Sequence, residues 1–583
     1  MKNKNTRVVL KRLSKYLHKY RAKLIVAAVL MLVSNLLLLF VPLLSGNAID
    51  AIGLTKGGVN FPAVFRYCAL MLLCYAASSV LSYLLSVGLI RMSQDVSFEL
   101  RRDIFERFVQ LPVSFYDRHP VGDIISCICY DVDTVNASLS TDLLQICVSV
   151  ITVVGSLAML IALSPALSLV VLVTVPVTMV FSRVHMRRLQ GLFRARSKKL
   201  GELNSLTEES VSAQKTANVY GCEESMIARF EASNAEAIQA YYIADYKSCI
   251  LGPGVNFINN ISLSAGSALG VILCLSGQIT LGAVSSFVLY SRKFSGPIRE
   301  AANIMSEIQA AVAAAERVFR LMDEPIETPD VDDAMPLSDA HGNVGMEHVS
   351  FGYEAGKTVL QDLSIDIKRG SVVAIVGPTG AGKTTIVNLL MRFYDTNAGR
   401  ITVDGQDIRE VIRRDLRLSY AMVLQDTWLF RGSIYDNIAY GNRNATYEQV
   451  VEAAKAAKIH SFISSLPAGY DTMLDDDSVN ISKGQKQLFT IARAMLIDAR
   501  MLILDEATSN VDTQTEIEIN EAMQRLMKDK TCFVIAHRLS TIERADLILV
   551  MDGGAVVEQG THAELIAKKG LYQSIYASQF EIY

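Results

Sequence analysis

Long apolar runs dominate the first half of the chain, and shorter polar segments separate them. A helix needs about 20 apolar residues to cross a hydrocarbon core of about 30 Å. The runs have this length, so the sequence predicts an all-α transmembrane domain with six spans, at residues 24–44, 65–90, 143–163, 167–184, 250–275 and 281–298. Because the number of spans is even, both ends of the chain should lie on one side of the membrane.

Basic residues are unevenly distributed over the connections between these runs. Residues 91–142 carry five arginines and residues 183–199 carry seven basic residues, whereas Lys56 is the one basic residue in 45–62. Cytoplasmic loops carry an excess of Lys and Arg, so we expect the two basic connections and both termini in the cytoplasm. The second and fourth runs continue into long polar segments, which predicts helices that project well beyond the bilayer.

The N-terminal residues have the pattern of an amphipathic helix. Leu10, Leu13, Leu17 and Tyr20 recur at helical spacing with basic residues between them, which is typical of a helix on an anionic membrane surface. A disordered basic tail is the alternative. The first long apolar run exceeds a cleavable signal segment in length and lacks a small-residue cleavage site, so we expect it to stay in the membrane.

The second half of the chain has a different composition. Residues 324–343 are acidic and contain prolines without a helical or strand period, which indicates a linker. Beyond them the composition is that of a soluble α/β domain. We therefore expect a transmembrane domain at residues 1–323, which includes the N-terminal interfacial helix, then the linker, and then an α/β domain at 344–583 with a helical subdomain.

A glycine-rich loop lies between an apolar, β-branched run at residues 371–376 and a helix-like segment. Strand, loop and helix in this order form a P-loop: backbone N–H groups and the helix N-terminus bind phosphate oxygens, Lys383 reaches the β- and γ-phosphates, and Thr384 ligates Mg²⁺. The sequence therefore predicts an ATP site that is formed by Gly377, Pro378, Thr379, Gly380, Ala381, Gly382, Lys383, Thr384 and Thr385.

A second short apolar run ends in two carboxylates. Residues 501–504 precede Asp505 and Glu506, and the carboxyl end of such a strand meets the phosphate loop in α/β folds. We expect Asp505 to hold Mg²⁺ and Glu506 to polarise the attacking water. A pair of this kind is more often a solvated strand end, but the glycine loop upstream favours the catalytic interpretation.

Residues 481–487 read Ile-Ser-Lys-Gly-Gln-Lys-Gln and precede a helix-like segment. Here the chain resembles the ATP-binding cassette family, whose signature is LSGGQ followed by a basic residue and Gln. The resemblance covers essentially the whole chain, in the exporter arrangement of six spans and one cassette. It implies that two cassettes dimerise head to tail, so that Ser482, Lys483, Gly484 and Gln485 cover ATP on the loop of a second subunit. Ser482 is also expected to cap the following helix.

The resemblance assigns further roles around the glycine loop. It implies that Tyr353 stacks on adenine, that Gln425 senses the γ-phosphate and Mg²⁺, and that His537 is the γ-phosphate switch. Taken singly, such residues are more often packed than bound to a ligand, but their order around one loop favours these roles. Two segments resemble the coupling helices of the family, residues 114–123 and 211–221.

Three departures from the family pattern favour a heterodimer over a homodimer. Lys483 replaces the first signature glycine, Asn510 and Val511 stand where Ala and Leu are usual, and residues 472–480 lack the usual glycine and carry three aspartates. In the family, such departures occur together in the catalytically intact subunit of asymmetric two-gene exporters, whose other subunit often lacks the glutamate equivalent to Glu506. A homodimer, in which Lys483 points into solvent and both sites hydrolyse ATP, is the alternative.

The resemblance implies ATP-driven export of an amphipathic or hydrophobic drug, lipid or peptide across a bacterial cell membrane. An importer or an ATP-gated channel of the same fold is the alternative, because the nucleotide motifs do not set the direction of transport. A soluble DNA-repair ATPase with the same motifs would carry coiled-coil heptads in place of the apolar runs, so the sequence disfavours it.

Polar residues inside the spans indicate a substrate path. Asn256, Asn259 and Asn260 share one helical face, so we expect them to face a cavity or another helix. Arg292 and Lys293 lie about eleven residues into the last span, near the middle of the bilayer, where charge is costly and usually functional. The predicted spans offer them no Asp or Glu, so water, a carboxylate of a partner subunit, an anionic or amphipathic substrate, or pairing within the protein are the alternatives.

Composition narrows the class of protein further. Hydrophobic residues make up 51% of the chain and charged residues 20%, which is too apolar for an ordinary soluble protein of this size. The net charge of −3 provides no basic field for nucleic acid. The nine cysteines form no CxxC pair and have no histidines in a ligand-like spacing, so we expect neither a zinc site nor a disulfide framework.

Overall fold

The structure is a computed structural model, and it describes residues 2–53, 59–337, 340–354, 356–425, 427–474, 481–505, 512–536 and 539–580. The chain forms two compact units. The first, called the helical unit, comprises Met1–Gln110 and His119–Glu324, and the second, called the α/β unit, comprises Leu111–Arg118 and Pro325–Tyr583.

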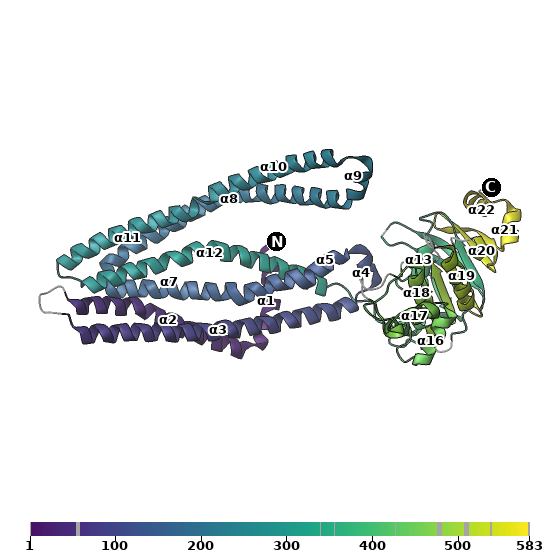
Figure 1. Cartoon of the computed structure of the whole chain (residues 1–583), viewed down its shortest axis with the longest axis horizontal. Helices are drawn as coiled ribbons and strands as arrows, with labels where there is room; N and C mark the ends of the chain where they lie inside the picture. The colour runs from purple at the N-terminus through teal and green to yellow at the C-terminus, as the bar shows by residue number, and fades with distance from the viewer. Residues whose placement is uncertain are drawn as a thin grey trace. The chain divides into compact units, whose positions relative to one another are not determined.

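Long helices make up the helical unit (Figure 1). Short π-helical segments, Cys127–Asp131 and Ser138–Asp142, connect α5, α6 and α7. The helices are α1 (Lys2–Lys19), α2 (Arg21–Ile52), α3 (Phe61–Val109), α5 (Val121–Ser126), α6 (Val132–Ala137), α7 (Leu143–Leu163), α8 (Pro165–Ser212), α9 (Gln214–Tyr220), α10 (Glu223–Ser248), α11 (Leu251–Leu275) and α12 (Leu281–Met322).

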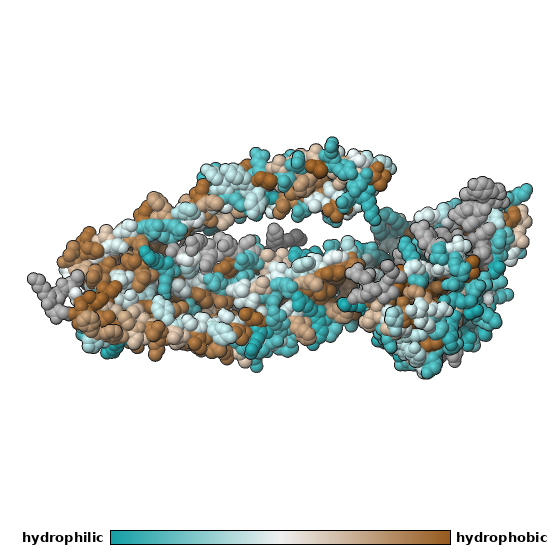
Figure 2. Space-filling view, in the orientation of Figure 1, coloured by the Kyte–Doolittle hydropathy of each residue, from teal (hydrophilic) through white to brown (hydrophobic). Residues whose placement is uncertain are grey.

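Five helical segments among the described residues are long and apolar enough to cross a membrane. They contain the first five predicted spans, and Figure 2 shows hydrophobic side chains on the outside of the helices at the left of the view. The sixth predicted span lies in α12, which is not among the five segments, because Arg292 and Lys293 interrupt its apolar part. The helices α3 and α8 continue without a break to Val109 and Ser212, as their polar extensions predict.

The N-terminal helix α1 forms as predicted, but its apolar side packs on the protein. Val9 is buried, and Leu13 and Leu17 pack into the same cluster against side chains of α3 and α12. The hydroxyl of Tyr16 donates to Asp103 at 2.9 Å, and burial together with this bond raises the pKa of Tyr16. The predicted Leu10 is exposed, so α3 and α12 cover only part of this face, and its contact with an anionic leaflet stays a prediction.

Two sheets form the centre of the α/β unit. In the six-stranded sheet, of order β12-β11-β3-β10-β9-β6, all neighbours are parallel except β12 and β11. Its central strands are continuous apolar runs, as expected for strands that are buried on both faces. The strands are β3 (Val372–Val376), β6 (Tyr420–Val423), β9 (Met501–Asp505), β10 (Thr531–Ile535), β11 (Leu547–Asp552) and β12 (Ala555–Gly560).

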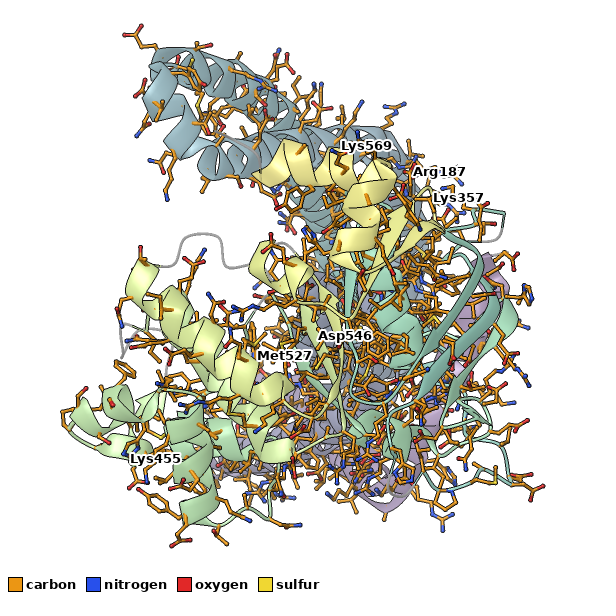
Figure 3. The ribbon with its side chains drawn as sticks, turned by 90° about the vertical axis from the view of Figure 1, so that its right-hand side faces the viewer. Arg187, Lys357, Lys455, Met527, Asp546 and Lys569 are labelled. Carbon is orange, nitrogen blue, oxygen red and sulfur yellow. The ribbon has the colours of Figure 1, made fainter. Side chains whose placement is uncertain are left out.

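The second sheet is antiparallel and has the order β2-β1-β4-β5, and a two-stranded ribbon pairs β7 with β8. Asp546, labelled in Figure 3, accepts from the backbone N–H of Val372 at 2.8 Å and so ties the starts of β11 and β3 together. The strands are β1 (Val344–Phe351), β2 (Leu360–Ile367), β4 (Ala398–Val403), β5 (Gln406–Asp407), β7 (Gly432–Ser433) and β8 (Met473–Leu474).

Helices cover these sheets and form a subdomain in which α15, α16 and α19 pack around α18. The predicted fold class, an all-α membrane domain followed by an α/β ATPase domain with a helical subdomain, is confirmed. The helices are α4 (Val113–Arg118), α13 (Lys383–Leu390), α14 (Arg413–Leu418), α15 (Ile434–Ala439), α16 (Tyr447–Ala456), α17 (His460–Ser465), α18 (Lys483–Ile497), α19 (Thr513–Met527), α20 (Leu539–Glu543), α21 (His562–Lys568) and α22 (Leu571–Phe580).

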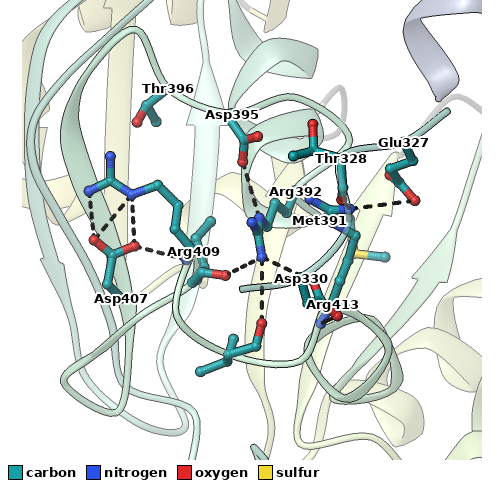
Figure 4. A network of polar contacts seen from close by, with 12 residues as sticks. Glu327, Thr328, Asp330, Met391, Arg392, Asp395, Thr396, Asp407, Arg409 and Arg413 are labelled. Carbon is teal, nitrogen blue, oxygen red and sulfur yellow. Dashed lines mark hydrogen bonds and ion pairs between the residues drawn. The ribbon is translucent and has the colours of Figure 1, made fainter. Parts of the chain in front are cut away.

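The acidic segment that follows α12 is held on the α/β unit. Glu327 pairs with Arg417 at 2.5 Å, and Asp330 accepts from the backbone N–H of Arg413 at 3.1 Å. Figure 4 shows Glu327 and Asp330 facing Arg413 and the buried Arg392. Ion pairs with arginines therefore position a segment whose sequence indicates only a linker.

Candidate functional site

The glycine-rich loop connects the carboxyl end of β3 to the first turn of α13, as the sequence predicts. Gly380 and Gly382 have φ values of +86° and +97°, a region that favours glycine. A Cβ on Gly382 would also come within 2.8 Å of a methyl group of Leu360. The loop therefore depends on glycine for its turn, and it places the N-terminus of α13 where phosphate oxygens can bind.

Lys383 is held over this loop. Its ammonium group donates to the carbonyl of Gly377 at 2.7 Å and to that of Pro378 at 3.0 Å. Burial lowers the pKa of Lys383, and the charge of Asp505 opposes this effect. The side chain thus lies between the loop and the end of β9, from where it can reach a phosphate.

Three strand ends bring the predicted ligands of ATP and Mg²⁺ to one edge of the sheet. The register pairs Ile535 with both Ile375 and Asp505, and Val423 with Leu504. Asp505 ends β9, and the exposed Gln425 follows the neighbouring strand β6, so both lie at the edge where the carboxyl ends of the parallel strands meet. Thr384 is exposed on the first turn of α13, so a hydroxyl, a carboxylate and an amide oxygen are available, the donors that suit Mg²⁺.

Tyr353 lies beside α13, and its neighbours fix its ring. Its hydroxyl donates to Thr385 and accepts from Asn388, both at 3.1 Å. The ring packs edge-on against Phe351 and Tyr394, each at 5.0 Å between centroids. Because 46% of Tyr353 is exposed, the ring has free surface for stacking on a base.

Tyr394 links this tyrosine to α4, the first of the two predicted coupling segments. Its hydroxyl donates to Asp117 of α4, and burial together with this bond raises the pKa of Tyr394. Phe115 of α4 is buried. The predicted domain boundary placed residues 111–118 in the transmembrane domain, whereas this segment packs within the α/β unit.

The signature segment begins α18 with a capping box. The hydroxyl of Ser482 accepts from the backbone N–H of Gln485 at 3.1 Å, and the side chain of Gln485 accepts from the backbone N–H of Ser482 at 3.0 Å. Ser482 and Lys483 are exposed, whereas Gly484 is buried. The predicted capping role of Ser482 is therefore confirmed, and Lys483 points away from the core.

Two of the predicted catalytic residues, Glu506 and His537, lie outside the described residues, as do residues 475–480 and 509–511. Asp512 is described and caps α19 through the backbone N–H of Thr515 at 2.9 Å.

The three asparagines predicted to face a cavity do so. Asn256, Asn259 and Asn260 line a cavity of about 80 Å³ between α8, α11 and α12, so this prediction is confirmed. Arg292 lines the same cavity.

Lys293 has a different environment from its neighbour Arg292. Its ammonium group donates to the carbonyl of Leu38 in α2 at 2.6 Å. In a regular helix the N–H four residues later would bind this carbonyl, but that residue is Pro42, which has no N–H. Lys293 thus replaces the missing backbone donor. Of the alternatives that the sequence left open for Lys293, the structure therefore shows pairing within the protein.

Further contacts continue this seam between α2 and α12. Ser286 donates to the carbonyl of Pro42 at 2.8 Å, and Asp50 accepts from the backbone N–H of Gly282 at 2.7 Å. The backbones touch at Gly46 and Gly282, because a Cβ on Gly282 would lie 2.0 Å from the carbonyl oxygen of Gly46. The polar residues of α12 therefore fix it against α2.

Comparisons with known proteins agree with this architecture. A family model described as "ABC transporter transmembrane region" matches residues 24–298, and one described as "ABC transporter" matches residues 360–509. A protein called "Fatty acid ABC transporter ATP-binding/permease protein" in Mycobacterium bovis is 44% identical over 515 residues, which cover 88% of this chain and 81% of the relative. The chain belongs to the ABC transporter family.

Other ABC transporters match this chain over nearly its full length. An uncharacterized ABC transporter ATP-binding protein of Bacillus subtilis, YfiC, is 40% identical over 582 residues, 100% of this chain and 96% of the relative. The solved structure of a bacterial Atm1-family ABC exporter with ATP bound has a TM-score of 0.77 and 31% identity, and covers 96% of this chain and 98% of that one. The predicted ATPase activity coupled to transport is thereby confirmed.

Sequence reasoning missed several residues that the folded transporter brings to these sites. Tyr394 and Asn388 contact Tyr353, and Thr178 and Ser291 line the cavity. The sequence could have indicated Thr178 and Ser291, because each is a polar residue inside an apolar run. Tyr394 offered no local signal, because its contacts come from segments distant in the sequence.

Proposed function

We propose that this ABC transporter uses ATP and Mg²⁺ to export an amphipathic or hydrophobic molecule across the bacterial cell membrane by alternating access. The likeness to the ATP-bound Atm1-family exporter over 96% of the chain carries the proposal. The relative named a fatty acid transporter supports a lipid-like substrate, with drugs and peptides as the other classes. Both termini and the α/β unit would lie in the cytoplasm.

Each residue of the nucleotide site has a role in this proposal. The loop from Gly377 to Thr385 and Lys383 bind the phosphates, Tyr353 stacks on adenine, and Thr384, Gln425 and Asp505 hold Mg²⁺, which neutralises charge on the transferred phosphoryl group. Glu506 polarises the attacking water and His537 contacts the γ-phosphate.

Direction of transport separates export from import or channel activity. In inside-out vesicles that contain the assembled transporter, ATP should drive a fluorescent fatty acid or an amphipathic dye into the lumen. Loss of substrate from preloaded vesicles on addition of ATP would indicate import, and flux that follows the substrate gradient in either direction would indicate a channel.

We propose further that the transporter works as a heterodimer, in which this chain supplies Glu506 and borrows an unaltered signature from its partner. The altered signature at Lys483 and the other two departures from the family pattern, at residues 510–511 and 472–480, support this proposal. We expect the chain expressed alone to show little phosphate release, and the complex co-purified from its native host to show full activity. Robust, cooperative hydrolysis by the chain alone would establish a homodimer.

The contact of Tyr394 with Asp117 predicts an effect on coupling. Replacing Tyr394 by Phe keeps the ring that packs on Tyr353 and removes the hydrogen bond to α4. A hydrogen bond to a charged group contributes about 1.5–3 kcal/mol, or at least about tenfold in an equilibrium. We expect unchanged ATP affinity and a loss of substrate-stimulated ATPase activity of about that size, measured by phosphate release with and without substrate.

A matched control is available at Tyr420, which begins β6. Its hydroxyl is buried and has no hydrogen-bond partner among the described residues, so Tyr420→Phe should leave the stimulation unchanged. Equal stimulation in Tyr394→Phe and the wild type would contradict the coupling role of Tyr394.

A further inference from the structure

The cavity between α8, α11 and α12 is small and mostly polar. Its volume is about 80 Å³, whereas one water molecule needs about 10–15 Å³ of such space. It therefore holds several waters or one compact polar group, but not a whole lipid or drug molecule. Its lining residues are Val171, Thr174, Val175, Thr178, Asn256, Asn259, Asn260, Ser262, Leu263, Ser291 and Arg292.

Three side-chain atoms at this cavity are buried without a hydrogen-bond partner among the described residues. They are the hydroxyls of Thr178 and Ser291 and the amide nitrogen of Asn259. Thr178 is 1% exposed. A buried polar group without a partner costs free energy, and here three such groups from three different helices line one cavity.

The unpaired groups share one chemical property, the ability to donate a hydrogen bond. The amide nitrogen of Asn259 can only donate, and the hydroxyls of Thr178 and Ser291 can turn to do so. Arg292 is the one residue of the lining that carries a formal charge, and that charge is positive. Donors and a cation around one cavity match a ligand group that accepts hydrogen bonds and is negatively charged.

Thr174, one turn before Thr178 on α8, behaves differently. Its hydroxyl donates to the carbonyl of Val170 and lies 2.7 Å from the hydroxyl of Ser262. Its polar atom is thus satisfied within the protein, although the residue lines the same cavity. Unpaired donors are therefore a property of particular positions rather than of every polar residue there.

The two adjacent cations of α12, Arg292 and Lys293, have different roles. Lys293 binds the carbonyl of Leu38 that Pro42 leaves unpaired, and it does not line the cavity. By fixing α12 on α2, this contact sets the rotation of α12 that places Ser291 and Arg292 at the cavity. Lys293 is thus a positioning residue.

We propose that this cavity binds the oxyanion head group, carboxylate or phosphate, of an amphipathic substrate, while the apolar tail stays outside it. The inference rests on the proposed export function and names its substrate class, an anionic amphiphile. Thr178, Asn259 and Ser291 donate to the oxyanion, and Arg292 supplies the opposite charge.

Binding to the assembled transporter in lipid nanodiscs tests the proposal. The probes are decanoate, 1-decanol and decyltrimethylammonium, which share a tail, and acetate and inorganic phosphate, which have none. Charged hydrogen bonds contribute about 1.5–3 kcal/mol, so Thr178→Val and Arg292→Gln should each weaken decanoate binding at least about tenfold. Thr207→Val, the same change on α8 at a residue that bonds the carbonyl of Leu203 and does not line the cavity, should alter it less than about threefold. Binding of decanol and the cation should be weak and similar in all variants.

Two results would overturn the proposal. If Thr178→Val raises the melting temperature and leaves decanoate affinity unchanged, the cavity is dry and the hydroxyl is merely unpaired. If acetate or phosphate binds as tightly as decanoate, the site recognises a small anion and not an amphiphile. Transport is read separately in vesicles: decanoate that binds with these variant effects but is not moved by ATP contradicts the export function and leaves the head-group site intact.

Discussion

Replacing Glu506 by Gln is expected to abolish ATP turnover while ATP still binds. The residue follows Asp505 at the end of β9, and only β10 lies between β9 and β3, whose end carries the phosphate loop, so its carboxylate is expected to polarise the attacking water. The amide keeps the shape but cannot accept the proton, and loss of such a group costs about 10²–10⁴-fold in rate. Phosphate release by the purified, assembled transporter measures the effect, and a fluorescent ATP analogue reports binding.

Glu521→Gln is a suitable control for this experiment. Glu521 pairs with Lys458 on the surface of the α/β unit, at 2.8 Å, so its neutralisation should leave turnover within about twofold of the wild type, as for an exposed ion pair. In the proposed heterodimer one Glu506→Gln substitution removes nearly all turnover. Rapid hydrolysis by an assembled Glu506→Gln transporter would show that another residue activates the water.

Replacing Gly282 by Ala is expected to destabilise the helical unit strongly. The added Cβ would lie 2.0 Å from the carbonyl oxygen of Gly46 and 2.5 Å from the carboxylate of Asp50. Because the first of these atoms belongs to the backbone, α2 and α12 must move apart, which strains the bonds of Ser286 and Lys293 to α2. Overpacking costs about 1–3 kcal/mol, and each carbonyl left unpaired adds about 1–3 kcal/mol.

Gly88→Ala in α3 is the matched control, because a Cβ on Gly88 meets no atom within 4 Å. In a helix interior the change from Gly to Ala is favourable by about 1 kcal/mol, so the two substitutions should shift the melting temperature in opposite directions. Thermal unfolding of the detergent-solubilised protein, followed by size-exclusion chromatography, measures both. If the melting temperature of Gly282→Ala equals or exceeds that of the wild type, α2 and α12 do not touch at this point.

The sequence alone determined the features that depend on neighbouring residues. The apolar runs determine where helices can span a bilayer, since their length must match the hydrocarbon core. The loop from Gly377 to Thr385 predicts a phosphate site because its glycines, its lysine and the following helix are contiguous. Ser482 and Gln485 form a capping box for the same reason, as they lie three positions apart in the chain.

The tertiary structure alone decided the features that depend on how helices rotate and pack. Arg292 and Lys293 are adjacent and alike in charge, yet one lines the cavity and the other binds the carbonyl of Leu38, 255 positions away in the chain. The apolar stripe of α1 fits a membrane surface and the side chains of α3 and α12 equally well, because both present apolar groups to it. Local pattern determines which face of a helix is apolar or polar, but only the packed fold determines what that face meets.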